Sequence, residues 1–209
     1  KGDKLSFLIE NDDRNNKSRA TQVEILSPTT AAAKNSNNDT ISVLLLEETN
    51  KVTIRTFSMN LPFAALLANK YKTLETRNGT MFVPYPSGTK MLLHVGQRTY
   101  PDGNRHLDVM KSGGLSDDEI TALKSLPKGY NKGQVVAIVE LGDTYETTIE
   151  ERSVPEFQRN AAAFGADSGR MVTEIKRVEY LKKGIRVSGR GGVFKSVVDA
   201  NAIQEGWLS

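Results

Sequence analysis

The stretch KYKTLETRNG, which begins at Lys70, concentrates side chains that can bind a ligand or take part in its chemistry. Alternate residues of a β-strand share one face, so Thr73, Glu75 and Arg77 would point to the same side of a strand. Glu75 would then accept hydrogen bonds, while the planar guanidinium of Arg77 donates them. Lys70 and Lys72 add positive charge beside this pair. An exposed strand whose charges face water has the same composition, so this stretch alone leaves a ligand cleft and a solvated surface as alternatives.

A helix is expected to lead into this stretch. Residues 51–60 alternate as a strand, and LPFAALLANKY then supplies strong helix formers, which predicts a helix from about 61 to 71. Asn60 offers its side chain as the N-cap, and Pro62 suits the first turn, where a missing N–H costs nothing. The N–H groups at this helix end, near Asn60 and Leu61, would favour an anion.

The remaining pattern predicts an α+β fold, with a mixed sheet or small β-barrel flanked by helices. Residues 41–48 fit either a strand or a short helix. Ser116 and Glu119 have the spacing of a capping box, which predicts an acidic helix of about ten residues there. The other expected elements are strands at 73–77, 89–98, 134–146, 172–181 and 191–198 and a helix within 153–165.

The chain is expected to begin with a small separate unit. Residues 1–26 alternate as two strands around a polar loop, which predicts a β-hairpin. The small and polar residues at 27–40 are typical of a linker, and residues 41–209 then form the main domain. An isolated hairpin is marginally stable, so this one must add to another sheet or be the remnant of a larger domain. Its sequence resembles the last two strands of a cold-shock domain in Gly2, Leu5, Phe7, Arg19, Ala20 and Val23.

The composition excludes several classes of site. The sequence contains no cysteine and only two histidines, which excludes disulfides, thiolate metal sites and a histidine-rich metal centre, and we expect no metal and no cofactor. No apolar run approaches the roughly 18 to 20 residues that a membrane-spanning helix needs, so we expect no membrane partner. The first residues, KGDKLSF, lack the pattern of a signal sequence. We therefore expect a soluble intracellular protein, with the cytoplasm favoured.

Charge is distributed unevenly along the chain. Residues 51–112 carry nine Lys and Arg against three Asp and Glu, residues 113–175 carry six against eleven, and residues 176–198 carry seven against one. If the two basic segments meet in space, they form a positive field suited to a polyanion such as RNA. If they do not meet, they are solvated surface.

The order of these segments resembles the ASCH domain, a PUA-like β-barrel. The run from Lys72 to Arg77 matches the Lys-Thr-x-Glu-Thr-Arg strand of the small vertebrate ASCH proteins called endothelial-overexpressed lipopolysaccharide-associated factors. The preceding helix, the strand around His94 and the glycine-rich final strand extend the likeness over about residues 55–198. The other matching residues are Ser58, Pro62, Phe63, Ala64, Leu181, Ile185, Gly192, Val193 and Phe194.

The resemblance implies that a cleft beside the helix binds RNA or a nucleotide, in RNA processing or translation. Lys72 and Arg77 would contact phosphate or carbonyl oxygens, and Glu75 would accept from a base amine. His94 fits equally well a hydrogen-bonded core histidine and a donor that lines the cleft. The further candidates for nucleic-acid contact are Asn60, Lys70, Arg98, Arg186 and Arg190.

Two other functions stay open from the sequence. Some bacterial ASCH proteins hydrolyse N4-acetylcytidine, and the resemblance implies that this chain could be such an amidohydrolase. Lys72 would then activate the reaction, Glu75 would act as the acid or base, and Thr73 would supply the hydroxyl nucleophile. The third alternative is a protein-interaction module without catalysis.

Overall fold

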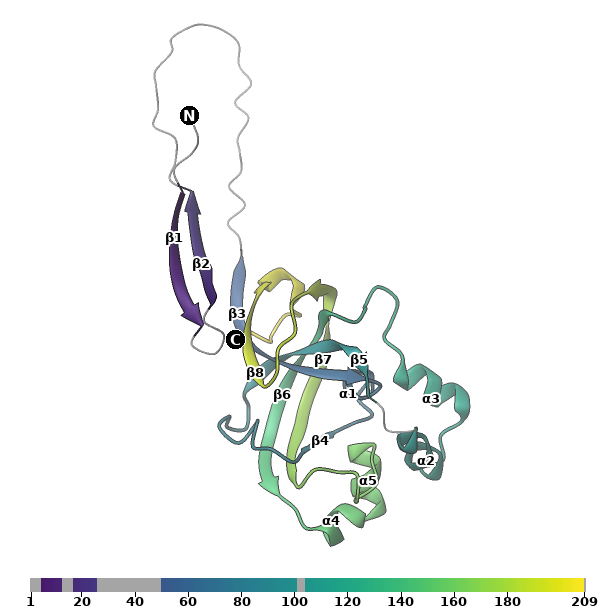
Figure 1. Ribbon diagram of the computed structural model, residues 1–209. Coiled ribbons are helices and arrows are strands. Elements are labelled where there is room, and N and C mark those ends of the chain that lie inside the picture. Colours follow the sequence, from purple (N-terminus) through teal and green to yellow (C-terminus); the bar gives the residue numbers. More distant parts are fainter. Residues whose placement is uncertain (1–4, 13–16, 26–49, 101–103, 209) are drawn as a thin grey trace, which may run out of the picture. The chain divides into compact units, whose positions relative to one another are not determined.

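A computed structural model describes residues 5–12, 17–25, 50–100 and 104–208 (Figure 1). The chain divides into two compact units, Lys1–Leu46 and Glu47–Ser209. The predicted linker at 27–40 and the predicted strand or helix at 41–48 lie outside the described residues.

The first unit contains an antiparallel pair of strands, as predicted. Strand β1 (Leu5–Asp12) pairs with β2 (Lys17–Ile25), and Leu5 lies opposite Ile25. Both strands extend into the polar segment that the sequence predicts as a loop, because backbone pairing continues as far as Asp12 and Lys17.

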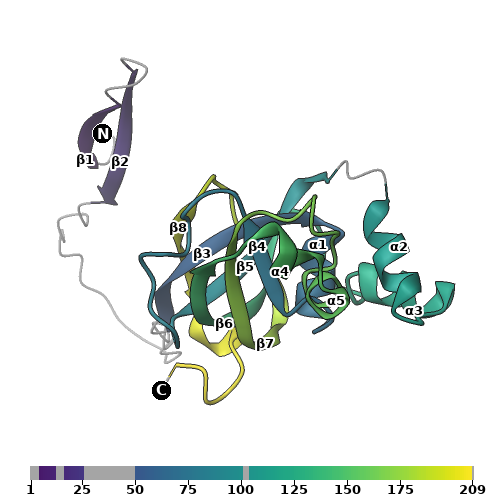
Figure 2. The same ribbon diagram turned by 90° about the horizontal axis from the view of Figure 1, so that it is seen from below.

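The second unit is built on one mixed sheet that curls into a half-barrel (Figures 1 and 2). The strand order is β4-β7-β6-β5-β3-β8, with β3 and β5 parallel and the other neighbours antiparallel. This confirms a mixed sheet with flanking helices. The strands are β3 (Lys51–Leu61), β4 (Leu74–Arg77), β5 (Lys90–Thr99), β6 (Gln134–Glu146), β7 (Met171–Arg186) and β8 (Val193–Asp199).

Short helices lie around this sheet. Figures 1 and 2 both show α2 and α3 next to each other, with α5 near β4. The capping box predicted at Ser116 and Glu119 is confirmed, since the Ser116 side chain accepts from the Glu119 N–H and the Glu119 carboxylate accepts from the Ser116 N–H. The helices are α1 (Phe63–Ala68), α2 (Arg105–Ser112), α3 (Asp117–Lys124), α4 (Ile149–Ser153), α5 (Pro155–Ala161) and the 3₁₀ turn η1 (Ala200–Ala202).

Helix α1 is shorter than predicted, and its expected N-cap is wrong. Asn60 belongs to β3, whose pairing with β5 continues to Leu61 opposite Thr99. The N-cap is Pro62, which makes no side-chain capping bond. At the other end the backbone of Lys70 turns to a φ of 65°, which a helix cannot contain. The N-terminal end of the helix therefore lies at Pro62 and Phe63, two to three residues after the predicted N-cap Asn60.

The core of the second unit packs on both faces of the sheet. One cluster joins α1 to β3, β5 and β6 and includes Phe57, Leu67 and Met91, which are fully buried. A second cluster lies around Trp207, whose indole Nε1 donates to Glu179 Oε2 at 2.6 Å. Burying each such large side chain stabilises the fold by about 1.5–3 kcal/mol, so these clusters hold the strands that carry the charged residues.

Candidate functional site

The charged residues of β4 open onto a cavity of about 810 Å³. Strand β3 contributes Ser58 and Asn60 to its wall, and β4 contributes Glu75, Thr76 and Arg77. The beginning of α2 and the segment 161–169 after α5 complete the lining. The cavity therefore joins parts of the chain that are about a hundred residues apart in sequence.

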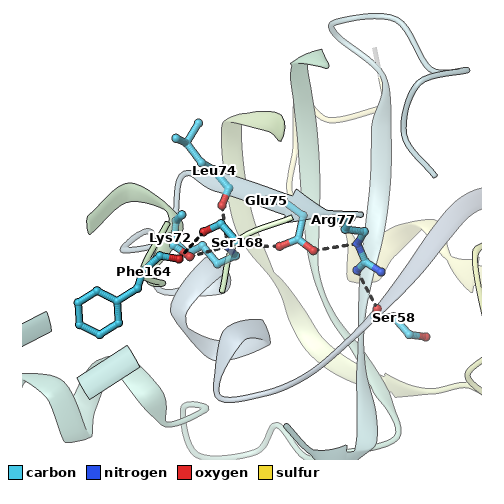
Figure 3. A network of polar contacts seen from close by, with 8 residues as sticks. Ser58, Lys72, Leu74, Glu75, Arg77, Phe164 and Ser168 are labelled. Carbon is cyan, nitrogen blue, oxygen red and sulfur yellow. Dashed lines mark hydrogen bonds and ion pairs between the residues drawn. The ribbon is translucent and has the colours of Figure 1, made fainter. Parts of the chain in front are cut away.

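A continuous polar chain runs along one side of this cavity (Figure 3). Lys72 Nζ lies 3.4 Å from Glu75 Oε2. Arg77 Nε donates to Glu75 Oε1 at 2.9 Å, and Arg77 Nη2 donates to the backbone oxygen of Ser58 at 3.4 Å. The carboxylate of Glu75 is thus held between two cations, as the alternation of the sequence predicts for the Glu75–Arg77 pair.

Lys72 is a buried cation with protein acceptors around it. Its Nζ donates to Leu74 O at 2.6 Å and to Ala161 O at 2.7 Å, with Glu75 Oε2 as the third neighbour. Burial lowers the pKa of Lys72 below its ordinary value of 10.5, and the charge of Glu75 acts in the opposite direction. Because three acceptors surround three N–H donors, the side chain fixes β4 and α5 in place.

Aromatic rings also line the cavity. Phe63 meets Tyr100 edge to face with ring centroids 5.2 Å apart, and it meets His106 at 5.7 Å. Half of Tyr100 is exposed to solvent, whereas His106 is buried. Such a wall offers apolar faces on which a planar ligand ring can stack.

The rim of the cavity carries one further ion pair. Arg105 Nε lies 2.7 Å from Asp167 Oδ2, and both side chains are well exposed to solvent. An exposed pair of this kind contributes only about 0–1 kcal/mol, so Arg105 can turn its donors to an anionic ligand at small cost.

Glycine is required where the 161–169 segment meets β4. A Cβ atom on Gly169 would lie 2.1 Å from the carbonyl carbon of Arg77. The two backbones therefore pack directly against each other, and both Arg77 and Gly169 line the cavity.

The structure brings together only some of the predicted site residues. Asn60, Lys72, Glu75 and Arg77 line the cavity. Thr73 does not, since its side chain is exposed and only its backbone is engaged, with the N–H donating to Asn160 O. The predicted site residues that also lie outside the cavity lining are Lys70, His94, Arg98, Arg186 and Arg190, of which all but His94 are exposed.

His94 is a buried, hydrogen-bonded histidine behind the cavity wall. Its Nδ1 lies 3.0 Å from Ser58 Oγ, and its Nε2 lies 3.1 Å from the backbone oxygen of Val187. Burial lowers the pKa of His94 below its ordinary value of 6.5. Of the two interpretations of the sequence, the geometry agrees with the core histidine.

The residues missed by the sequence analysis come from α2 and its approach and from the segment 161–169. Arg105, His106 and the preceding Tyr100 were not assigned to the site, and α2 was not predicted. A helical signal was present, because His106, Val109 and Met110 are buried at the i, i+3, i+4 spacing of one helix face.

Comparison with known families gives no assignment, because no family model matches the chain. The likeness to ASCH domains therefore stays a prediction. Within the described part of the chain, no group of three or more His, Asp or Glu side chains is arranged to hold a metal ion. Over the same residues, no helix has the length and apolar character to cross a membrane.

Proposed function

We propose that this protein binds RNA or a nucleotide and that its fold is the PUA-like barrel of an ASCH domain. A base enters the cavity that Lys72, Glu75 and Arg77 line. The observation that carries this proposal is that an aromatic wall and a carboxylate held between two cations border one cavity of about 810 Å³. Such a volume lies within the range of about 300–1,000 Å³ that small-molecule sites occupy.

The aromatic and the charged residues of the cavity lining have different roles in this proposal. Phe63 and Tyr100 stack on the base, and base stacking on an aromatic ring contributes about 1–3 kcal/mol. Glu75 accepts from an N–H group of the base, while Arg77 and the rim Arg105 donate to carbonyl or phosphate oxygens.

The exposed cations outside the cavity bind the rest of an RNA strand. Arg98 is the next-to-last residue of β5, Arg186 ends β7, and Arg190 follows in the glycine-rich segment before β8. Contacts from such residues go to phosphates and carry little sequence information. A longer RNA should therefore bind more tightly than a mononucleotide and with a steeper dependence on salt.

The test is a fluorescence anisotropy titration of a labelled single-stranded RNA. Tyr100→Ala should weaken binding about tenfold, as loss of one stacking contact predicts. The matched control is Tyr145→Ala, because Tyr145 is similarly exposed but lies in β6 away from the cavity lining. Equal effects of the two changes, or no binding of RNA or mononucleotide at about 1 mM, would overturn the proposal.

A second candidate function is hydrolysis of a modified nucleoside such as N4-acetylcytidine. Lys72 and Glu75 favour it, because both are buried and both line the cavity. Incubation with N4-acetylcytidine, with detection of cytidine and acetate, tests it. Turnover that disappears in Glu75→Gln and persists in Thr73→Ala is the result expected of an enzyme with this geometry. If the protein shows no turnover in an assay where an active bacterial enzyme, run as the positive control, does, the cavity is a binding site and not a catalytic one.

A further inference from the structure

The turn that follows β4 carries the last two residues of the charged stretch KYKTLETRNG, which are Asn78 and Gly79. Strand pairing with β7 ends at Arg77, opposite Met171, and the segment 78–89 consists of turns and bends before β5 begins. Asn78 and Gly79 are exposed to solvent, and both line the cavity. Asn78 is the only asparagine of the sequence that is followed by glycine.

Few contacts hold this turn. Within the part of the chain that the structure describes, neither the side chain of Asn78 nor the backbone N–H of Gly79 makes a hydrogen bond. A Cβ atom on Gly79 would meet nothing within 4 Å, so the space around this backbone is open. By contrast, the amide of Asn69 donates to Leu123 O at 2.8 Å and to Ser125 O at 2.9 Å. The backbone at Asn78 can therefore turn without breaking a hydrogen bond of its side chain or displacing a neighbour.

An asparagine that precedes glycine in such a turn can lose its side-chain amide in water, because no side chain on the glycine obstructs the backbone nitrogen. The nitrogen of Gly79 attacks Cγ of Asn78, and a bond forms between these two atoms. The bond from Cγ to the amide nitrogen breaks, and ammonia leaves with the proton of the Gly79 N–H. Water then opens the resulting succinimide ring at either carbonyl group. The products are aspartate and isoaspartate, in which the backbone runs through the former side chain.

We propose that Asn78 is a site of spontaneous deamidation and that this reaction places a carboxylate in the lining of the cavity, next in sequence to Arg77. The exposure of Asn78 and Gly79, the open space at Gly79 and the lack of hydrogen bonds described above support it. One neutral amide becomes one anion, so the formal net charge of the chain falls by one from +3. The isoaspartate product also adds one carbon atom to the backbone directly after β4.

The new carboxylate acts against an anionic ligand. The side chain of Arg77 is 31% exposed, and it donates through Nε to Glu75 and through Nη2 to the backbone oxygen of Ser58. A carboxylate at residue 78 competes for the remaining donors of this guanidinium and repels a phosphate group. The affinity for a nucleotide or RNA should therefore fall as the protein ages. This consequence rests on the proposed function, whereas the modification itself does not.

The first experiment follows the reaction by mass. The full chain is incubated at mildly alkaline pH, sampled over several weeks, digested in mild acid and analysed by peptide mass spectrometry. The peptide that contains Asn78 should gain about one dalton, because OH replaces NH₂, and an isoaspartyl methyltransferase should label part of the product. The peptide that contains Asn131 is the internal control, because Asn131 is also exposed but precedes Lys132, and it should stay unchanged over the same period.

A variant tests the role of the glycine in this reaction. Gly79→Ala adds a methyl group in open space at a φ outside the left-handed region, so the turn should keep its structure. The mass gain at Asn78 should slow severalfold, because the added side chain hinders ring closure. Equal rates at Asn78 and Asn131, or an equal rate in Gly79→Ala, would overturn the inference. The comparison between the two asparagines needs no variant, so it decides even if Gly79→Ala fails to fold.

The second experiment measures the effect on binding, by fluorescence anisotropy with the labelled RNA. Asn78→Asp reproduces the charge of the deamidated protein and should weaken binding about threefold or more. Asn131→Asp is the charge-matched control, and it should have a much smaller effect, because Asn131 does not line the cavity and salt screens its charge. Equal affinities of Asn78→Asp and the unaltered protein would overturn the effect on the cavity. If the unaltered protein binds no RNA and no mononucleotide, the proposed function fails, while the mass measurement still decides the modification.

Discussion

At the scale of single residues, Glu75 is the residue of the cavity wall whose carboxylate pairs with two cations. Glu75→Ala leaves the buried charge of Lys72 without its carboxylate and should lower the free energy of unfolding by about 3 kcal/mol. Urea denaturation measures this loss. Glu146→Ala is the control, because Glu146 pairs with Arg170 where both side chains are about 60% exposed, and it should cost less than about 1 kcal/mol. Similar losses in the two variants would contradict a structural role for Glu75.

The buried imidazole of His94 gives the protein a pH dependence in acid. Because burial lowers its pKa below 6.5, the folded protein binds this proton less readily than the unfolded chain does. The stability it contributes is therefore complete above about pH 6.5 and is lost as the pH falls through the lowered pKa. Urea denaturation from pH 7.5 to 5 should show this decline, and His94→Gln should make it shallower. An identical decline in both proteins would assign it to other groups.

Some of the residue chemistry could be predicted from the sequence, and the limit has a physical reason. The contact between Glu75 and Arg77 follows from strand alternation, which is a local property. Alternation also predicts Thr73 on the same side, but Thr73 precedes β4 and its side chain is exposed. Whether a side chain of a strand faces a cavity or water depends on which distant segments of the chain pack against that strand.

At the scale of elements, the close approach of the 161–169 segment to β4 is the most constrained contact of the site. Gly169→Ala places a methyl group against backbone atoms of Arg77 that cannot move independently, and overpacking of this kind costs about 1–3 kcal/mol. Thermal denaturation should show a lowered Tm. Gly79→Ala is the control, because nothing lies within 4 Å of a Cβ there. An unchanged Tm in Gly169→Ala would mean that the two backbones can separate freely.

The elements that the sequence predicts best are those with a strong internal pattern. Strand β6 is observed over the predicted range, since its continuous apolar run has no competing helical signal. The predicted helix at 61–71 is too long at both ends, because β3 continues to Leu61 and because the backbone of Lys70 has a φ of 65°. Tertiary pairing outweighed the strong helix propensity of the sequence after β3.

At the scale of the whole molecule, the second unit should fold without the first. Three buried clusters lie within Glu47–Ser209 and give this unit a hydrophobic core of its own. A chain of residues 47–209 should therefore have a Tm within about 2 °C of the full chain, a difference of less than about 1 kcal/mol. Differential scanning calorimetry makes the comparison. A large fall in Tm would show that the N-terminal residues complete the core.

The cavity itself could not be predicted from the sequence, because it is a property of the whole sheet. The order β4-β7-β6-β5-β3-β8 places β3 and β4 far apart in the sheet, yet Arg77 of β4 reaches the backbone oxygen of Ser58 in β3. The curl of the half-barrel makes this possible. Strand order and sheet curvature depend on contacts between distant segments, so no local pattern of residues predicts them.

The position of Trp207 has a consequence for how this protein can be observed. It is the single tryptophan of the sequence, it is fully buried, and the guanidinium of Arg177 lies 4.2 Å from its ring centroid. Its ring belongs to the second core cluster and does not line the candidate cavity. Intrinsic emission should therefore shift to longer wavelength when this cluster opens and stay constant while a nucleotide fills the cavity. In one sample, tryptophan fluorescence then reports unfolding and calorimetry reports nucleotide binding in the cavity, as two independent signals.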